Sequence, residues 1–259
     1  MLGQHFLVDG NIREKILDAA EIRDGECIVE IGSGTGYLTA GLLGRGARVI
    51  AIEIDRRLVE GLARAVIPNL TLVCADALRY PYRNLPTPYK VVANLPYNIS
   101  TPLLFLLIEA GLKMVLMLQK EVALRLSAQV GDANYGALSL VAQFYTDVRI
   151  LCSVSRNCFR PRPKVDSAVV VFDPPRHPRQ RVRHPAYFLK LVKGAFAHRR
   201  KQMLNSLSDA GFPRRNMEEA MHRMGLSSTV RGETLSLASF AELSNILSDI
   251  HADPLDEHP

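Results

Sequence analysis

The sequence lacks the cysteine arrangements that would indicate disulfide bonds or a metal centre. Its four cysteines (Cys27, Cys74, Cys152 and Cys158) form no CxxC pair, and no His/Cys cluster has the spacing of a zinc site. We therefore expect free thiols in a reducing compartment and no bound metal. Neither an HExxH nor a GxSxG motif occurs, so the sequence gives no support for hydrolase chemistry.

The sequence also has no long uninterrupted apolar run. The longest apolar stretch, Leu103 to Leu118, contains Glu109 and Lys113 and is a poor candidate for spanning a bilayer. The N-terminal residues lack the basic and then apolar pattern of a signal peptide. Apolar residues make up 47% and charged residues 22% of the chain, which is typical of globular proteins. We expect a soluble cytoplasmic protein without membrane contacts.

Acidic residues are missing from one long segment. Pro174 to Ser208 contains no Asp or Glu but nine Lys and Arg residues, in a chain of net charge +6. From Glu242 onward the bias is reversed, with five acids and no Lys or Arg. A segregated basic block suits the phosphate backbone of a nucleic acid, because each bound cation releases counterions. A solvated basic linker followed by one helix face would have the same composition.

The first half of the chain alternates between short apolar runs and helical patterns. The runs predict strands over residues 27–31, 48–53 and 70–74, a strand ending at Asn94, and a strand over 114–118. This alternation predicts an α/β fold with a doubly wound, mainly parallel sheet. Right-handed crossovers place the carboxyl ends of such strands at one edge, where ligands bind. Residues 148–151 and 168–172 predict an antiparallel strand pair at the side of the sheet.

The segment PPRHP (174–178) predicts a domain boundary, because closely spaced prolines interrupt regular structure. We expect one domain in residues 1–176 and a small helical domain in residues 177–259. In the second domain, apolar periodicity predicts helices over residues 186–196, 198–207, 217–224 and 235–247.

A glycine-rich segment follows the first of these strands. GSGTG (32–36) allows a tight turn and lets a ligand approach the backbone, although an ordinary strand-to-helix turn would also use such glycines. The nicotinamide fingerprint needs a further glycine where Tyr37 stands, which disfavours that cofactor. Glu53 ends the next strand, at about the distance where an acid binds a ribose diol. Asp76 follows the third strand, where it either binds an adenine amine or caps a turn.

The segment NLPYNIS (94–100) begins at Asn94, the last residue of the fourth of these strands. The Asn94 side-chain oxygen and the Leu95 carbonyl form an acceptor pair that could bind both hydrogens of an adenine N6 amine and localise its lone pair. Pro96 fixes φ and so stiffens the turn. Tyr97 offers a flat face on which a base can stack. The segment predicts a site for a flat group that carries an amine.

The glycine segment, the two acids and Asn94 occur in the order that resembles class I S-adenosylmethionine-dependent methyltransferases. NLPYNIS resembles the Asn/Asp-Pro-Pro-aromatic box of N6-adenine methyltransferases, and its second-position leucine makes it most similar to the rRNA adenine dimethyltransferases. Nearly the whole chain resembles this family, through the segments LGQHFLVD (2–9), QKEVALRL (119–126), NYGALS (134–139), FRPRPKVDSAVV (159–170), AFAHRRKQMLNSL (195–207) and RGETLSLASFAEL (231–243).

The resemblance implies that residues 1–176 form the catalytic domain and residues 177–259 an RNA-binding domain, and it implies a role for each matching residue. It implies S-adenosylmethionine as methyl donor, bound by His5, Leu7, Gly32, Gly34, Glu53, Ile54, Asp76, Ala77 and Asn94. It implies a catalytic set that consists of Asn94, Leu95, Pro96, Tyr97 and Phe159. In that set Phe159 would stack on the face of a flipped adenine opposite to Tyr97. RNA contacts are implied for Arg160, Arg162, Lys164, Arg199, Arg200 and Lys201.

Within the family, the pattern is most similar to the bacterial 16S rRNA adenine dimethyltransferases. The resemblance implies N6,N6-dimethylation of two adjacent adenines near the 3′ end of the rRNA, in an immature small ribosomal subunit, by a monomer. Two alternatives remain: a 23S rRNA adenine N6-methyltransferase of the macrolide-resistance type, and a non-catalytic ribosome-assembly or transcription factor on the same fold. The sequence starts almost at LGQHFLVD, so the short basic arm that usually precedes this segment is nearly absent, and RNA contact from such an arm stays an open question.

Overall fold

The computed structural model describes residues 4–175, 180–198 and 201–252 of the chain. Contacts divide the protein into two compact units, one of residues 1–127 with 145–174 and one of residues 128–144 with 175–259. The second unit includes residues 128–144, which the predicted boundary after residue 176 assigned to the first domain. These residues contain most of helix α6 (Ala137–Tyr145).

The first unit is built on a seven-stranded sheet with the order β4-β3-β2-β5-β6-β9-β7. Its strands are β2 (Cys27–Ile31), β3 (Arg48–Glu53), β4 (Leu70–Cys74), β5 (Tyr89–Asn94), β6 (Met114–Gln119), β7 (Asp147–Val154) and β9 (Ser167–Asp173). The neighbouring strands β4, β3, β2, β5 and β6 pair in parallel. Strand β9 pairs antiparallel with both β6 and β7. The predicted doubly wound, mainly parallel sheet with an antiparallel strand pair at its side is confirmed.

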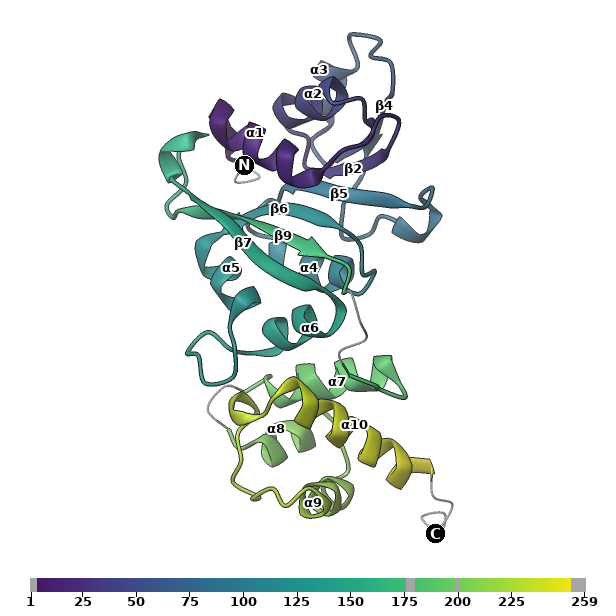
Figure 1. Ribbon diagram of the computed structural model, residues 1–259, viewed down its shortest axis with the longest axis vertical. Helices are drawn as coiled ribbons and strands as arrows, with labels where there is room; N and C mark the ends of the chain where they lie inside the picture. Colours follow the sequence, from purple (N-terminus) through teal and green to yellow (C-terminus); the bar gives the residue numbers. More distant parts are fainter. Residues whose placement is uncertain (1–3, 176–179, 199–200, 253–259) are drawn as a thin grey trace. The chain divides into compact units, whose positions relative to one another are not determined.

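Helices cover both faces of this sheet. Helices α1 (Gly10–Ala20) and α2 (Tyr37–Gly44) lie on one face, and α4 (Ser100–Ile108) and α5 (Lys120–Ser127) lie on the other (Figure 1). Because side chains alternate along a strand, Val115 and Met117 of β6 pack in one cluster with Ile16 of α1 and Leu42 of α2, while Leu116 faces the other way. Burial on both faces explains why the central strands are apolar throughout.

Aspartates start two helices of the first unit. The Asp9 carboxylate accepts a hydrogen bond from the backbone N–H of Ile12 at 3.0 Å and caps α1. Asp55 caps α3 (Arg56–Leu62) in the same way, because its carboxylate accepts a hydrogen bond from the N–H of Arg57. These caps fix where a helix begins after β1 (Phe6–Leu7) and after β3.

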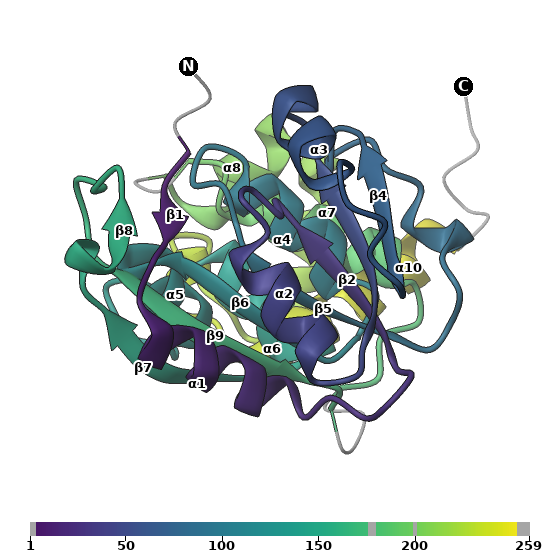
Figure 2. The same cartoon turned by 90° about the horizontal axis from the view of Figure 1, so that it is seen from above.

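A second, two-stranded sheet joins segments far apart in the chain. Strand β1 pairs antiparallel with β8 (Phe159–Arg160), with Phe6 opposite Arg160 and Leu7 opposite Phe159. Figure 2 shows β1 running from the described N-terminal residues into α1. The pairing brings the LGQHFLVD segment next to the FRPRPKVD segment. Short 3-10 turns complete the unit at Tyr82–Asn84 and Arg156–Cys158.

The second unit is helical in its described residues. It contains most of α6 together with α7 (Pro185–Ala195), α8 (Met203–Asp209), α9 (Arg214–Arg223), α10 (Leu237–Ala252) and a 3-10 turn at Gly232–Thr234. Phe188 and Phe240 are fully buried in its core. Gly194 lets α7 approach α8 closely, because a Cβ at that position would lie 2.9 Å from the Cβ of Ala210.

One predicted helix of the second unit starts later than expected. The prediction of a helix over 198–207 was wrong at its start, because α8 begins at Met203. The backbone N–H of Met203 donates to the carbonyl of Val230 outside the helix. Lys201 therefore precedes the helix. In the parts of the chain that the structure describes, no helix is long and apolar enough to cross a membrane.

Candidate active site

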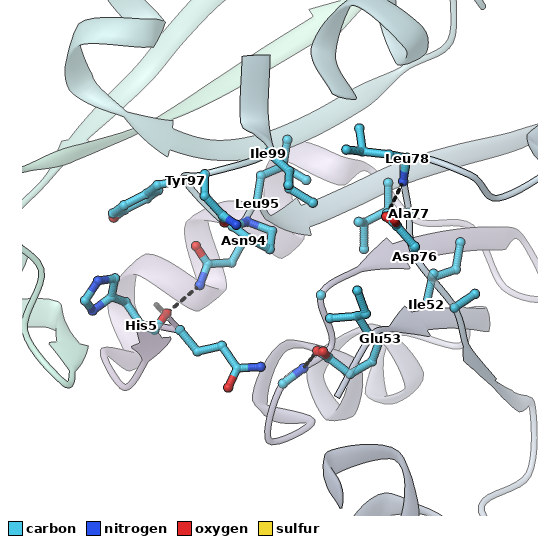
Figure 3. A pocket seen from close by; sticks show the side chains of 18 of the residues that line it. His5, Ile52, Glu53, Asp76, Ala77, Leu78, Asn94, Leu95, Tyr97 and Ile99 are labelled. Atoms are coloured by element: carbon cyan, nitrogen blue, oxygen red, sulfur yellow. Dashed lines mark hydrogen bonds between the residues drawn. The ribbon is translucent and has the colours of Figure 1, made fainter. Parts of the chain in front are cut away.

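A cavity lies at the carboxyl ends of strands β2 to β5 in the first unit (Figure 3). It is lined by Gln4, His5, Phe6, Ile31, Gly32, Gly34, Ile52, Glu53, Ile54, Ala75, Asp76, Ala77, Leu78, Asn94, Leu95, Pro96, Tyr97, Asn98 and Ile99. In the sheet order, β3 and β4 lie on one side of β2 and β5 lies on the other, so the side on which successive parallel strands are added changes at this point. Open α/β sheets bind their ligands at such a switch point.

The glycine-rich segment forms one wall of the cavity. Gly34 has φ +56°, and a Cβ there would lie 2.9 Å from the ring of Phe6. Gly32 has φ +76°, and its Cβ would lie 3.4 Å from Cδ of Pro96. Both positions combine a left-handed backbone with a close neighbour, which only glycine accommodates without strain. The wall is therefore bare backbone, which a ligand can approach closely.

Glu53 lies at the end of β3 with only 4% of its surface exposed. Its Oε2 accepts a hydrogen bond from the N–H of Gly34 at 3.0 Å, and its Oε1 accepts one from the N–H of Asp55 at 2.9 Å. Two backbone donors thus hold the carboxylate in one orientation. Each oxygen keeps further acceptor capacity, so the group fits a pair of ribose hydroxyls.

Asp76 follows β4 at the next position along the edge. Its Oδ1 accepts a hydrogen bond from the N–H of Leu78 at 2.9 Å, which fixes the side chain in a turn (Figure 3). Ile54, Ala77 and Ile99 line the same cavity and supply apolar surface around this carboxylate. An acceptor flanked by apolar side chains suits a flat heterocycle that carries an amine, such as the adenine of a nucleoside.

Asn94 ends β5 with a side chain that the protein itself orients. Its Nδ2 donates a hydrogen bond to the carbonyl oxygen of His5 at 3.0 Å. The reverse orientation would set two acceptors against each other, so Oδ1 must point away from His5. In Figure 3 this oxygen lies on the side of the amide that faces the Tyr97 ring. The cavity therefore presents a fixed acceptor next to an aromatic face.

Tyr97 is half-buried and lies in the turn after β5. Its hydroxyl forms a hydrogen bond of 2.6 Å with Oγ of Ser167, and burial raises the pKa of Tyr97. Its ring centroid lies 5.7 Å from that of His5, with an angle of 32° between the ring planes. The Nδ1 of His5 donates to the carbonyl of Pro161 at 2.8 Å. The Tyr97 ring is thus held at its hydroxyl by Ser167 and contacted along one side by the His5 ring.

Comparison with known proteins shows which family has this arrangement of residues around the cavity. The family model for ribosomal RNA adenine dimethylase matches residues 1–249 of the chain. The chain belongs to the ribosomal RNA adenine dimethylase family. It is an rRNA adenine dimethyltransferase, and S-adenosylmethionine is the methyl donor that the family uses.

Curated relatives in this family cover almost the whole chain. The chain is 42% identical to the ribosomal RNA small subunit methyltransferase A of Moorella thermoacetica, over 95% of this chain and 91% of the relative. It is 43% identical to the Streptococcus pneumoniae protein of the same name, over 95% of this chain and 90% of the relative.

Solved structures show the same fold. A dimethyladenosine transferase from Plasmodium falciparum aligns with a TM-score of 0.75 and 31% identity, over 92% of this chain and 96% of the other. The 23S rRNA methyltransferase ErmE aligns with a TM-score of 0.64 and 27% identity, over 94% of this chain and 99% of the other.

Most residues predicted for the methyl-donor site of this dimethyltransferase line the cavity together. They are His5, Gly32, Gly34, Glu53, Ile54, Asp76, Ala77 and Asn94. Leu7 is the exception, because its side chain is 6% exposed and packs in the hydrophobic core. Its neighbour Phe6 lines the cavity instead, as the alternation of side chains along β1 requires.

Among the predicted catalytic residues, Asn94, Leu95, Pro96 and Tyr97 line the cavity, and Phe159 does not. Phe159 is fully buried and packs in the core cluster that contains Leu7. A ring without exposed surface offers no face to a base, so the prediction that Phe159 forms the second stacking face is wrong for this structure. Its place in β8, opposite Leu7, gives it a structural role.

The predicted RNA contacts fall into two groups. Arg160, Arg162 and Lys164 are exposed in and after β8, close in sequence to Pro161, which binds His5. Lys201 is exposed in the second unit and forms an ion pair of 2.8 Å with Asp209. Arg199 and Arg200 lie outside the described residues.

Sequence reasoning missed several residues that line the cavity: Gln4, Phe6, Ile31, Ile52, Ala75, Leu78, Asn98 and Ile99. Gln4 and Phe6 lie in the segment that was already assigned to the methyl donor, and Asn98 and Ile99 lie in NLPYNIS. Strand alternation could have separated Phe6 from Leu7. No sequence pattern indicated Leu78, because its place in the cavity wall depends on how the turn after β4 folds.

A buried acid lies in β2, directly before the glycine-rich segment. Glu30 is 1% exposed, and its Oε2 accepts a hydrogen bond of 2.6 Å from the hydroxyl of Thr39 in α2. Burial, together with the nearby charge of Glu53, raises the pKa of Glu30 to about 7. Glu30 and Thr39 together tie the strand before the glycines to the helix after them.

Proposed function

We propose that this chain dimethylates N6 of two adjacent adenines near the 3′ end of 16S rRNA, in an immature small ribosomal subunit. The orientation of Asn94 is the observation that carries the proposal. The hydrogen bond from its Nδ2 to the His5 carbonyl directs an acceptor oxygen toward the side of the Tyr97 ring. The names of the relatives that match nearly the whole chain support the small ribosomal subunit as the substrate particle.

The amine of adenine is a weak nucleophile because its lone pair is delocalised into the ring. Asn94 Oδ1 and the Leu95 carbonyl accept hydrogen bonds from the two N6 hydrogens and localise that lone pair on nitrogen. Tyr97 holds the base by stacking, which contributes about 1–3 kcal/mol per base. Because the Asn94 side chain is already held in place, binding the base also orients it for attack.

Bound S-adenosylmethionine supplies a methyl group on a positively charged sulfur. The chain's part is to hold that donor beside Asn94: Glu53 accepts from its ribose, Asp76 accepts from its adenine amine, and the bare backbone at Gly32 and Gly34 admits it closely. The methylated amine is acidic while protonated and releases its proton to water. No general base is required for this step.

RNA recognition extends beyond the target base. Arg160, Arg162 and Lys164 are exposed on the segment next to His5 and supply cations for phosphates. Lys201 and, by sequence, Arg199 and Arg200 supply further cations in the second unit, which serves as an RNA-binding domain. The protein acts as a monomer in the cytoplasm, where the immature subunit is found.

Two alternatives are less well supported. A 23S rRNA methyltransferase shares the fold, but that structure, ErmE, aligns with a lower TM-score and identity than the dimethyladenosine transferase. A non-catalytic factor would not need Glu53, Asp76 and Asn94 arranged around one cavity. Both alternatives predict that immature small subunits are not methylated.

The test is methyl transfer by the purified protein with labelled S-adenosylmethionine. Immature small subunits and protein-free 23S rRNA are supplied in parallel, and dimethyladenosine is mapped in the product RNA. We expect two adjacent dimethyladenosines near the 3′ end of the small-subunit rRNA and no label in 23S rRNA. Label confined to 23S rRNA would establish the macrolide-resistance type, and no label in either RNA would leave a binding factor.

A further inference from the structure

The turn that carries Tyr97 has one hydrogen-bond tether for its ring. The Tyr97 hydroxyl lies 2.6 Å from Oγ of Ser167, 70 residues further along the chain. The backbone carbonyls of the same turn are used locally, since Pro96 accepts from the N–H of Ile99 and Tyr97 accepts from the Ser100 hydroxyl. These local bonds shape the turn but do not hold the Tyr97 side chain, whose ring lies beside the His5 ring and whose hydroxyl bonds to Ser167.

Ser167 is a rigid point of the fold. It is fully buried and begins β9, where it pairs with Gln119 of β6 and with Val154 of β7. Strand pairing on both sides fixes its backbone, and burial leaves its hydroxyl few partners other than Tyr97. A side chain so held restricts where the tyrosine hydroxyl can lie, and through it the plane of the ring.

We propose that Ser167 is a positioning residue for methyl transfer, which acts by holding the Tyr97 ring in the plane that the target adenine stacks on. The inference rests on the proposed function, because it names how that site orients its base. Ser167 has no surface of its own for substrate, so its effect passes through the tyrosine hydroxyl. Without this bond the ring samples other rotamers, and fewer bound adenines present N6 to Asn94 in line for attack.

The test compares Ser167→Ala, Tyr97→Phe and the double variant. Each single variant removes one half of the same hydrogen bond and keeps the ring. We expect kcat on immature small subunits to fall roughly fivefold in each single variant, the size of effect of one neutral hydrogen bond. The double variant should show the same roughly fivefold loss, because one interaction can be lost only once. Affinity for S-adenosylmethionine, measured by calorimetry, should stay within about twofold of wild type.

Two further variants separate positioning from stability. Tyr135→Phe removes another buried tyrosine hydroxyl, which donates to the Leu235 carbonyl at 2.9 Å in the second unit. It should lower the melting temperature about as much as Tyr97→Phe and leave kcat unchanged. Ser167→Thr keeps a hydroxyl in a strand, where β-branched residues are favoured, and should retain most of the turnover.

Three results would overturn the proposal: unchanged kcat in Ser167→Ala, a roughly 25-fold loss in the double variant, which is the product of independent effects, or an equal kcat loss in Tyr135→Phe. If Ser167→Ala fails to fold, Tyr97→Phe decides alone, and wild-type kcat in that variant overturns the proposal. Failure of the proposed function is a separate result, since it would appear as absent methylation by the wild-type protein.

Discussion

The two ends of the active-site cavity are held in different ways. At the methyl-donor end, Glu53 is fixed by backbone donors 2 and 19 residues away in the chain. At the target-base end, Asn94 is fixed by a carbonyl 89 residues away, and Tyr97 by a hydroxyl 70 residues away. The first end is assembled within a strand–turn–helix unit and its neighbouring strand. The second is assembled from the residue before β1, the turn after β5 and the start of β9.

This difference predicts separable defects. Changes at the methyl-donor end disturb contacts that serve the donor alone, and they should weaken S-adenosylmethionine binding while RNA still binds. Changes at the target-base end should lower the rate of transfer with the donor still bound. A single variant that weakened S-adenosylmethionine binding and lowered the transfer rate of bound donor equally would contradict this separation of the two ends.

Loss of the Glu53 carboxylate should have the largest effect at the donor end. Glu53→Ala removes the ribose acceptors and leaves the N–H groups of Gly34 and Asp55 without their partner. We expect the Kd for S-adenosylmethionine to rise by about 100-fold, because hydrogen bonds to charged groups contribute about 1.5–3 kcal/mol each. Calorimetry measures this Kd. Glu60→Ala is the matched control, since Glu60 is exposed and pairs with Arg56 on α3.

A methyl group at Gly34 should have a smaller effect in the same direction. Gly34→Ala forces a side chain onto a backbone with φ +56° and pushes against Phe6, which lines the cavity. Strain of about 1–2 kcal/mol predicts a rise of roughly tenfold in the Kd for S-adenosylmethionine. Gly61→Ala in α3 meets no atom within 4 Å and should be neutral or slightly stabilising. Equal effects at the two glycines would show that the Gly34 backbone has no special role.

The pH dependence of stability should show the smallest effect. Because burial raises the pKa of Glu30 from 4.5 to about 7, the folded protein binds this proton more tightly than the unfolded chain. Its contribution is fully present below pH 4.5 and is lost as pH rises through about 7. Glu30→Gln keeps an acceptor for Thr39 and removes the titration. The variant should gain melting temperature relative to wild type at pH 8 and lose that advantage at pH 5; a constant difference would show that Glu30 does not titrate in this range.

The same division explains what the sequence could predict. The fold and the donor end follow local patterns: apolar runs define the strands, and glycine or acid residues follow each one. Glu53 and Asp76 could therefore be placed at one edge without knowing any long-range contact. The family resemblance added the roles of these residues, and the cavity contains nearly all of them.

The incorrect predictions concern long-range packing. Phe159 and Leu7 both belong to segments of the site, but the pairing of β1 with β8 turns their side chains into the core. No local pattern contains that pairing. Likewise, α8 begins at Met203 because its first N–H bonds to the carbonyl of Val230, outside any window of helical periodicity. Ser167 lay within a matched segment, yet only the folded structure brings it to Tyr97.

The central claim is that Asn94 activates the adenine amine from an orientation fixed by the His5 carbonyl. Single-turnover methyl transfer by Asn94→Ala on immature small subunits tests it most directly, with binding of the RNA and of S-adenosylmethionine measured on the same protein. The account predicts that the transfer rate falls by about 100-fold or more, as for loss of one preorganised hydrogen-bonding group at a reacting centre, while RNA affinity stays within about twofold. A wild-type transfer rate in Asn94→Ala would contradict it.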